Sequence, residues 1–357
     1  MPRWFFNGGR LISLKVGIIS AGSWGTALAT LMAEKDYNVT IWAKEQEIVD
    51  SINTVHENSL FLKGIKLSEK IKAVSDIQSA VVSMDIVIVA SPSQYTRELL
   101  SGISFMISPG TYIVLASKGI ENGTLKMMYQ IAEDILPATL HKNIFVISGP
   151  TFAAELAMKM PTCAVIAGHN SEDMGSIQAI FSSPYMRIYR SNDITGVELG
   201  GALKNIFAIA VGILEGMGFG KNTQAALITR SIAEITRLVI AMGGNPLTIS
   251  GLSGIGDLVL TCTGDLSRNR QVGIRLGKGE KIDAILKSML MVAEGVTTTK
   301  AAYDLSKKVN VEMPITETLY RVLYENADLY KSFQALMTRS LKDELLSYGG
   351  FNDSSDT

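Results

Sequence analysis

KVGIISAGSWGTALATLMAEK, at residues 15–35, is the stretch that decides the fold of this chain. It puts an apolar strand, a glycine turn and an amphipathic helix in immediate succession, which is the context of a dinucleotide-binding turn. Gly22 and Gly25 hold the second and third glycine positions of the G-x-G-x-x-G pattern, and Ser20 stands at the first. Backbone N–H groups at a helix N-terminus favour anions. The turn Gly22-Ser23-Trp24-Gly25 therefore predicts a site for the pyrophosphate of a nicotinamide dinucleotide.

Two residues near this turn affect how the cofactor is held. A non-glycine residue is penalised wherever φ must be positive, so we expect Ser20 to tighten the turn and to weaken cofactor affinity. At the end of the second strand, where an acid usually meets the ribose 2′-hydroxyl, the first charged residue is Lys44. Its ammonium can neutralise a 2′-phosphate, which slightly favours NADP over NAD. An exposed lysine that opens a helix is the alternative.

The rest of the chain divides into two parts. Short β-branched runs alternate with helix-like stretches up to about Arg190, and helical spacing with glycine punctuation takes over after about Asn192. Near-continuous apolar strands are typical of a parallel sheet covered on both faces. We expect strands in KVGII (from Lys15), NVTIW (from Asn38), DIVIVA (from Asp85), TYIVLA (from Thr111), NIFVIS (from Asn143) and TCAVIA (from Thr162). The predicted class is α/β, with a Rossmann-type doubly wound parallel sheet followed by an all-helical C-terminal domain. The predicted boundaries are an N-terminal extension at 1–14, a dinucleotide-binding domain at 15–191, a helical substrate-binding domain at 192–345 and a polar tail at 346–357.

Composition excludes several classes of protein. The net charge of −1 and the lack of a basic stripe argue against a nucleic-acid partner. Cys163 and Cys262 lie far apart without CxxC spacing, which fits a reducing cytoplasm. The longest apolar run, residues 206–214, is shorter than the roughly 20 residues of a membrane span, and the N-terminus lacks the apolar region of a secretory signal. The three histidines form no metal-ligand spacing, so no metal is expected.

The residues with candidate chemistry lie in both parts. Lys204 is the only charged residue between Glu198 and Glu215, and burying a lone ammonium is costly unless it is paired or functional. A proton-transfer role and a lysine that is only structural or reaches the surface are both open at this point. Lys118 follows the strand TYIVLA at the carboxyl edge where α/β sheets bind ligands. Asp257 precedes Ser267-Arg268-Asn269, a cluster suited to a phosphate monoester or simply to a surface helix cap.

Eight ordered motifs connect these residues to a known family. They are GSWGTALA (from Gly22), INTVHEN (from Ile52), ASKGIE (from Ala116), SGPTFAAE (from Ser148), GGALKNIFAIAVGI (from Gly200), GLSGIGDLVLTCT (from Gly251), LSRNRQVG (from Leu266) and AEGVTTTKAA (from Ala293). At these motifs the chain closely resembles bacterial NAD(P)-dependent glycerol-3-phosphate dehydrogenase, from about Lys15 to about Leu345. The resemblance implies reversible hydride transfer between NAD(P)H and dihydroxyacetone phosphate to give sn-glycerol 3-phosphate. It also implies a homodimer and a role in phospholipid synthesis.

The resemblance also implies roles for single residues. Lys204 would be the proton acceptor in the oxidising direction, with Asp257 orienting it, and Lys118 would touch both cofactor and substrate. The further substrate contacts implied are Gly149, Thr151, Ser267, Arg268 and Asn269. Ser23, Trp24, Ala153, Arg268, Val292 and Glu294 would complete the cofactor site with Gly22, Gly25 and Lys44. Three residues depart from the family pattern: Ser20 replaces a glycine, Thr151 replaces a serine and Lys44 replaces an arginine.

Two rival interpretations remain at this stage. A β-hydroxyacid or 6-phosphogluconate type dehydrogenase would share the glycine turn and an analogous lysine, but LSRNR and SGPTFAAE argue against it. A dinucleotide-sensing module without activity is the second rival, and the presence of Lys118, Lys204 and Asp257 together argues against that.

Overall fold

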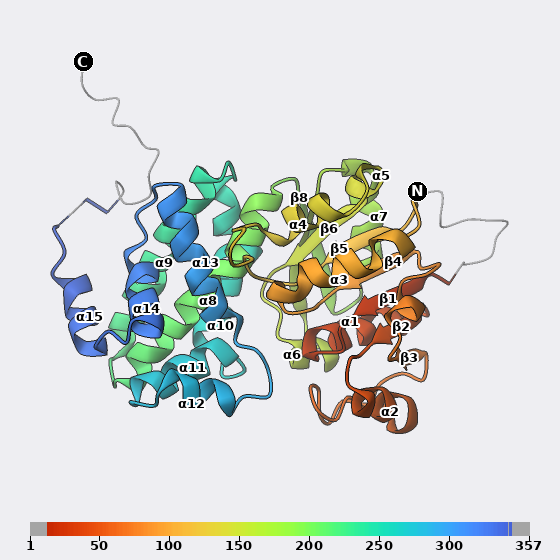
Figure 1. Ribbon diagram of the computed structural model, residues 1–357, viewed down its shortest axis with the longest axis horizontal. Coiled ribbons are helices and arrows are strands. Elements are labelled where there is room, and N and C mark those ends of the chain that lie inside the picture. The colour runs from red at the N-terminus through yellow and green to blue at the C-terminus, as the bar shows by residue number, and fades with distance from the viewer. Residues whose placement is uncertain (1–12, 342, 345–357) are drawn as a thin grey trace, which may run out of the picture. The chain divides into compact units, whose positions relative to one another are not determined.

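The computed structural model describes residues 13–341 and 343–344. Most of the predicted N-terminal extension at 1–14 and the whole predicted tail at 346–357 lie outside the described residues. The chain forms two compact units (Figure 1). The described part of the first unit is residues 13–118 and 126–194, and that of the second is residues 119–125 and 195–344, without 342. The predicted dinucleotide domain at 15–191 included residues 119–125, and the structure groups this segment with the helical unit instead.

The first unit is built on an eight-stranded sheet with the order β3-β2-β1-β4-β5-β6-β7-β8. The strands are β1 (Lys15–Ile19), β2 (Asn38–Trp42), β3 (Ile71–Val74), β4 (Ile86–Val89), β5 (Tyr112–Leu115), β6 (Ile144–Ser148), β7 (Thr162–Gly168) and β8 (Met186–Ser191). The six predicted strands are confirmed, and β3 and β8 are additional. Neighbouring strands are parallel except for β6 and β7, which pair antiparallel. The expected all-parallel sheet is therefore mostly parallel.

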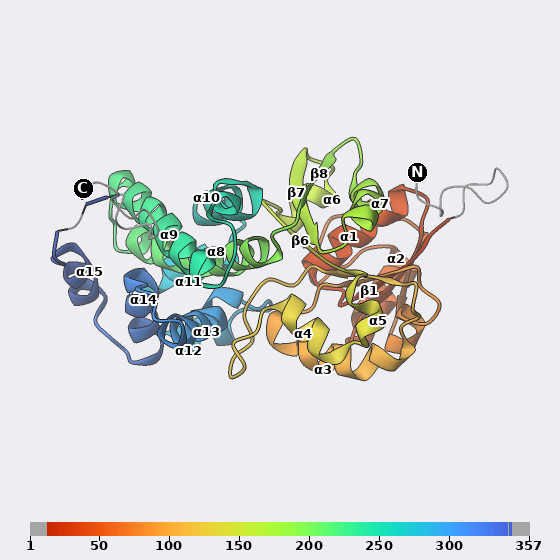
Figure 2. The same ribbon diagram turned by 90° about the horizontal axis from the view of Figure 1, so that it is seen from above.

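Helices cover both faces of this sheet. They are α1 (Ser23–Glu34), α2 (Gln46–Val55), α3 (Thr96–Ile103), α4 (Met128–Ile135), α5 (Ala138–His141), α6 (Ala153–Ala157) and α7 (Ser171–Phe181), with three-residue or four-residue 3-10 turns at Ile77–Ala80, Ser93–Tyr95 and Ser104–Met106. Figure 2 shows α1, α6 and α7 on one side of the sheet and α3, α4 and α5 on the other. Because β1, β4, β5 and β6 contact helices on both faces, their residues are almost all buried.

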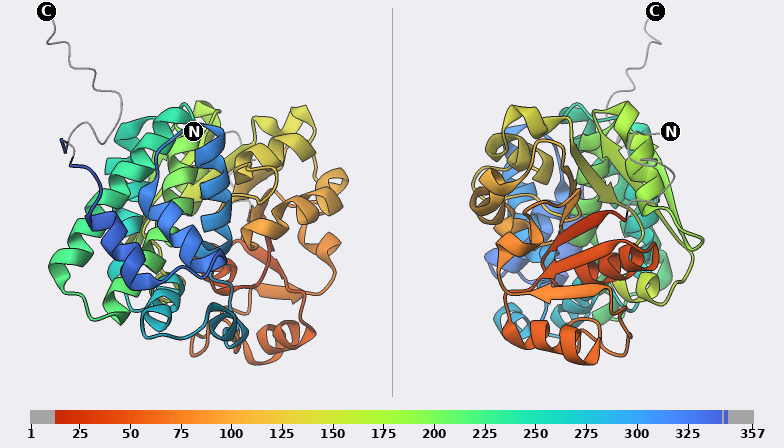
Figure 3. Two further views of the ribbon diagram at one scale, coloured as in Figure 1. Left: turned by 60° about the vertical axis from the view of Figure 1, so that its left-hand side comes forward. Right: turned by 90° about the vertical axis from the view of Figure 1, so that its right-hand side faces the viewer.

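The second unit is helical, green to blue in Figure 3. Its helices are α8 (Ile194–Gly216), α9 (Lys221–Ala241), α10 (Asp257–Thr263), α11 (Arg268–Gly277), α12 (Ile282–Lys287), α13 (Glu294–Lys308), α14 (Pro314–Tyr324) and α15 (Leu329–Met337), with a 3-10 turn at Pro246–Ser250 and a π-helical turn at Leu252–Gly256. Within the described residues α8 is the one helix long and apolar enough to cross a membrane, but 94% of its most apolar window is buried in the protein. This burial identifies α8 as a core helix.

Candidate active site

The glycine turn has an unusual backbone geometry at the position where the sequence predicts one. Ser20 has φ of +92°, a value that L side chains rarely adopt. A Cβ at Gly25 would lie 2.1 Å from the Ser20 carbonyl oxygen, so the close approach of α1 to β1 requires glycine there. A Cβ at Gly22 would meet only the Ser20 Oγ, at 3.8 Å. The space over Gly22 is therefore open, and packing does not explain the glycine.

The first turn of α1 offers donors for an anion. Gly22 is its N-cap and supplies no side-chain hydrogen bond to the turn. The Trp24 indole Nε1 is buried and has no hydrogen-bond partner among the described residues. A buried indole N–H ordinarily finds an acceptor. Open space over Gly22, a cap without a side chain and an orphaned donor fit a bound dinucleotide.

Asn58 buttresses this turn from the loop after α2. It is fully buried, and its amide donates to the Ala21 carbonyl at 2.7 Å and to the Thr26 Oγ1 at 2.8 Å. Its Oδ1 accepts from the Phe61 N–H at 3.0 Å. Sequence reasoning did not single out Asn58, although it ends the motif INTVHEN. Its amide bonds hold Ala21, the residue before Gly22, and Thr26 of α1 in place.

Three of the predicted substrate residues meet at the carboxyl edge of β5 and β6. The Gly149 carbonyl accepts from the Lys118 Nζ at 3.1 Å and from the Thr151 Oγ1 at 3.2 Å. Gly149 has φ of +140°, and a Cβ there would lie 2.9 Å from the Ala164 Cα. Only glycine fits both constraints. The unit therefore gathers an ammonium and a hydroxyl around one backbone carbonyl.

The other predicted residues of this unit, Lys44 and Ala153, follow the ends of β2 and β6. Lys44 is exposed and follows β2, next to the α2 N-cap Glu45. Ala153 is the first residue of α6, which follows β6. Both positions are at the carboxyl edge of the sheet, where parallel α/β sheets bind ligands.

In the helical unit Lys204 and Asp257 form a buried ion pair. The Lys204 Nζ donates to the Asp257 Oδ1, and the two side chains are 9% and 0% exposed. Thr261 donates to the Asp257 carbonyl at 2.6 Å and lies 3.4 Å from its Oδ1. Burial raises the pKa of the neighbouring Cys262 thiol to about 12, with Lys204 opposing the effect. The Lys204 side chain therefore does not reach the surface, and Asp257 is its partner.

Backbone contacts fix this pair. A Cβ at Gly200 would lie 2.4 Å from the Ser253 carbonyl oxygen, so α8 contacts the π-helical turn directly. That turn leads straight into α10, whose first residue is Asp257. The motifs GGALKN and GLSGIGD therefore meet through glycine, and their contact brings the carboxylate to the ammonium.

The predicted phosphate cluster lies at the start of α11. Ser267 is the N-cap, and its Oγ accepts from the Arg270 N–H at 3.2 Å. The Asn269 amide donates to the Asn205 Oδ1 at 2.9 Å, and its Oδ1 accepts from the Gly295 N–H at 2.9 Å. Ser267 thus caps the helix, but it is buried and not on the surface as the alternative interpretation expected, and Asn269 ties α11 to α8 and α13.

Arg268, Val292 and Glu294 have more solvent around them. The side chains of Arg268 and Val292 are both exposed, and Glu294 begins α13. Although Arg268 as a whole is exposed, the protein around its guanidinium lowers the pKa of that group by desolvation, and the Glu294 carboxylate opposes the shift. Arg268 and Glu294, both predicted for the cofactor site, are therefore electrostatic neighbours.

α8 and α11 run parallel and pack against each other, and this packing sets the position of Ser267-Arg268-Asn269 along α8. Cβ atoms at Gly212 and Gly216 would lie 2.2 Å from the Arg270 and Ile274 carbonyl oxygens. Cβ atoms at Gly273 and Gly277 would lie 2.0 and 2.3 Å from those of Ile209 and Ile213. The contacts advance four residues at a time on both helices, which is the i±4 ridge packing of closely approaching helices. The Asn205–Asn269 bond continues this series, so Lys204 and the first turn of α11 lie at the same level.

The predicted residues thus fall into two groups, one in each unit. Residues 22–25, Lys44, Lys118, Gly149, Thr151 and Ala153 belong to the sheet unit, and Lys204, Asp257, Ser267, Arg268, Asn269, Val292 and Glu294 belong to the helical unit. Within the described residues no group of three or more His, Cys, Asp or Glu side chains is arranged to hold a metal ion. An uncapped helix with an open glycine turn and a buried lysine–carboxylate pair near a helix N-terminus are suited to a nucleotide and to proton transfer, respectively.

Comparison with known proteins agrees over almost the whole chain. The family model for the N-terminus of NAD-dependent glycerol-3-phosphate dehydrogenase matches residues 15–174, and that for its C-terminus matches residues 193–334. The glycerol-3-phosphate dehydrogenases (NAD(P)+) of Geobacter sp. strain M21 and Geobacter sulfurreducens are 49% and 47% identical to this chain, covering 92% and 93% of it and 98% and 99% of those proteins. The crystal structure of glycerol-3-phosphate dehydrogenase from Coxiella burnetii has a TM-score of 0.87 at 34% identity, covering 92% of this chain and 99% of that one. The chain belongs to the NAD-dependent glycerol-3-phosphate dehydrogenase family.

Proposed function

We propose that this protein catalyses the reversible, NAD(P)-dependent interconversion of dihydroxyacetone phosphate and sn-glycerol 3-phosphate. The observation that carries the proposal is the buried Lys204–Asp257 pair, level with the first turn of α11. Burying a lone ammonium costs free energy. A carboxylate partner offsets that cost, so the chain can hold a buried lysine at the place where a proton is transferred. Family membership supports the choice of substrate.

The sheet unit holds the cofactor in this proposal. Gly22 and the first turn of α1 would hold the pyrophosphate, because the backbone there is open and the first N–H groups of α1 favour an anion. When bound, the nicotinamide takes up or delivers the hydride at C2 of the substrate. Lys44, exposed at the end of β2, neutralises a 2′-phosphate and gives a slight preference for NADP.

Lys204 handles the proton. In the oxidising direction Lys204 first loses a proton to solvent, and its neutral Nζ then accepts the proton of the C2 hydroxyl. In the reducing direction the ammonium donates a proton to the C2 oxygen. Asp257 holds the ammonium, because its Oδ1 accepts from the Nζ, and Thr261 steadies the carboxylate. The family resemblance supports substrate contacts for Lys118, Gly149 and Thr151, and cofactor contacts for Ala153, Val292 and Glu294.

The start of α11 holds the phosphate. Arg268 offers a planar fork of donors, and Ser267 and Asn269 offer a hydroxyl and an amide beside it. Binding the remote phosphate orients C2, so removal of the phosphate from the substrate lowers turnover as well as affinity. The family resemblance further supports a cytoplasmic homodimer that supplies glycerol phosphate for phospholipid synthesis.

The direct test follows the absorbance of NADPH or NADH with dihydroxyacetone phosphate and the purified chain. The proposal requires oxidation that depends on substrate, and its absence refutes the proposal. Activity with a β-hydroxyacid instead would favour the rival dehydrogenase. Lys204→Ala should lower kcat by about 10²–10⁴-fold with cofactor binding intact. Lys300→Ala, which removes an exposed lysine paired with Asp304 in the same unit, is the matched control and should leave kcat unchanged.

A further inference from the structure

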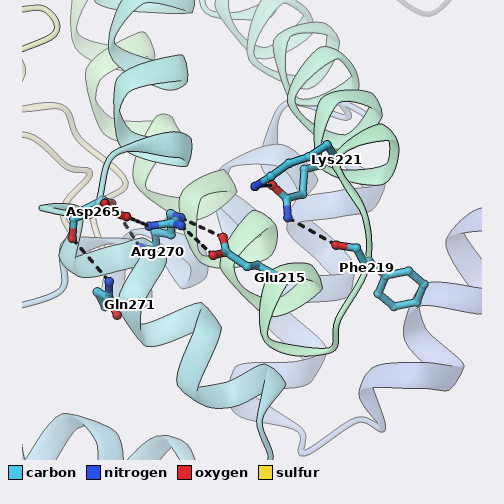
Figure 4. A network of polar contacts seen from close by, with 8 residues as sticks. Glu215, Phe219, Lys221, Asp265, Arg270 and Gln271 are labelled. Carbon is cyan, nitrogen blue, oxygen red and sulfur yellow. Dashed lines mark hydrogen bonds and ion pairs between the residues drawn. The ribbon is translucent and has the colours of Figure 1, made fainter.

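Arg270 uses its guanidinium on two carboxylates. It donates from Nε and Nη2 to the two carboxylate oxygens of Glu215, at 3.0 and 2.7 Å, and from Nη1 to the Asp265 Oδ1 at 2.9 Å (Figure 4). Its side chain is 9% exposed, that of Glu215 is 29% exposed and that of Asp265 is 92% exposed. The bidentate bond to Glu215 is therefore the partly desolvated and geometrically specific contact of the two.

Neither member of the pair suits its own helix. Arg270 is the third residue of α11, where an N-cap serine is usually followed by Glu or Gln and where the helix dipole disfavours a cation. Glu215 is in the last turn of α8, where the dipole disfavours an anion. Local helix stability explains neither residue, so the contact between the helices is their common purpose.

The pair joins the two helices that carry the chemistry of this unit. Lys204 is on α8, and Ser267-Arg268-Asn269 begins α11 immediately before Arg270. The Asn205–Asn269 bond and the glycine contacts set which turns of the two helices face each other, and the planar fork of Arg270 adds directional hydrogen bonds that resist smaller rotations and shifts.

We propose that the Arg270–Glu215 pair positions the substrate phosphate relative to Lys204. Arg270 is then a positioning residue and Arg268 a phosphate ligand, although both are arginines of the same LSRNR motif. Each of the three guanidinium nitrogens of Arg270 already donates to a carboxylate, and two carboxylates around it would repel a phosphate. The inference rests on the proposed function, because it assumes a phosphate at the start of α11.

The test compares two substrates in one variant. Arg270→Lys keeps the charge but loses the fork, so kcat/KM for dihydroxyacetone phosphate should fall about 10- to 100-fold through misplacement of the phosphate. The value for dihydroxyacetone, which lacks the phosphate, should change by less than about 2-fold, because it does not depend on that placement. Glu215→Gln should have the same signature with a smaller amplitude, and the two substitutions together should be less than additive.

Arg275→Lys is the matched control. Arg275 lies on the same helix and makes a similar bidentate contact with Glu280, but the contact is on the surface and away from the cluster. It should leave both substrates unchanged. An equal fall for both substrates, or no fall for dihydroxyacetone phosphate, overturns the inference. Should Arg270→Lys fail to fold, the substrate ratio of Glu215→Gln decides. An inactive wild-type chain refutes the proposed function, a result distinct from an active wild type with an unchanged ratio.

Discussion

Glu234 offers a measurement of how the helical unit balances burial against hydrogen bonding. This residue of α9 is 1% exposed, and its carboxylate accepts from the Ile315 N–H at 2.5 Å, the Thr316 N–H at 3.2 Å and the Thr316 Oγ1 at 2.9 Å. It thereby caps α14, whose N-cap Met313 makes no side-chain cap. Desolvation raises the pKa of Glu234 to about 7, and the hydrogen bonds at α14 oppose that rise.

The raised pKa fixes the sign of a pH effect. Between about pH 4.5 and 7 the folded state keeps a proton that the unfolded state has lost, so this contribution to stability is complete below pH 4.5 and falls as the pH rises to 7. A difference of roughly 2.5 pKa units corresponds to about 3 kcal/mol of unfolding free energy. Glu234→Gln cannot titrate and should lose this dependence. The stability advantage of the wild type over the variant should therefore shrink by about 3 kcal/mol from pH 4.5 to pH 8.

Urea unfolding of both proteins at half-unit pH intervals measures this difference, and other titrating groups cancel in the comparison. Glu317→Gln is the control, because a hydrogen bond from Lys307 lowers the pKa of Glu317, so its contribution is lost only as the pH falls below the unfolded value. Its difference from wild type should stay flat from pH 5 to 8. A flat difference for Glu234→Gln would refute the reasoning and mean that the donors of α14 outweigh desolvation.

Three other substitutions test single features. Ser20→Gly should relieve about 1 kcal/mol or more of backbone strain at φ +92° and should lower the Kd for NADPH. The control Ser83→Gly, at the ordinary left-handed φ of +59°, should gain less stability. Equal gains in thermal unfolding would contradict a strained Ser20. Gly212→Ala should lower the melting temperature, since its Cβ would lie 2.2 Å from the α11 backbone. The control Gly102→Ala, with open space around it in α3, should raise the melting temperature slightly. An unchanged melting temperature for Gly212→Ala would show that the helices can separate at little cost. Cys262 should resist alkylation by iodoacetamide in the folded protein at pH 8, because its pKa is about 12, and rapid labelling there would contradict its burial.

Four of the six strands that sequence alone predicted, β1, β4, β5 and β6, are almost wholly buried on both faces. KVGII and TYIVLA are continuous apolar runs because helices cover them on both sides. The edge strands β3 and β8 were not predicted, because their exposed residues, such as Lys72 and Arg187, interrupt any apolar run. The reversal of β7 also escaped, since strand direction depends on the partner across the sheet and leaves no local pattern.

The residues of the site likewise divide into those that the sequence predicts and those that it does not. Gly22, Gly25 and the strained Ser20 were predictable, because backbone geometry at a tight turn is a local property. Asn58 and Arg270 were not, because their roles come from partners 37 and 55 residues away in sequence, respectively. The only sequence signal for either was its place in a family motif.

The glycine contacts between α8 and α11 have a consequence for the choice of substrate. Because the contacts repeat every four residues, α11 can dock elsewhere only by slipping a whole turn, which would displace its first residues by about 6 Å along α8. A shift of that size exceeds the span of a carbon–oxygen–phosphorus linkage. Under the proposed function, the packing of the two helices fixes the distance between Lys204 and the residues that hold the phosphate. Discrimination between a three-carbon phosphate and a longer one is then a property of the backbone, which point substitutions among the ligands would not easily change.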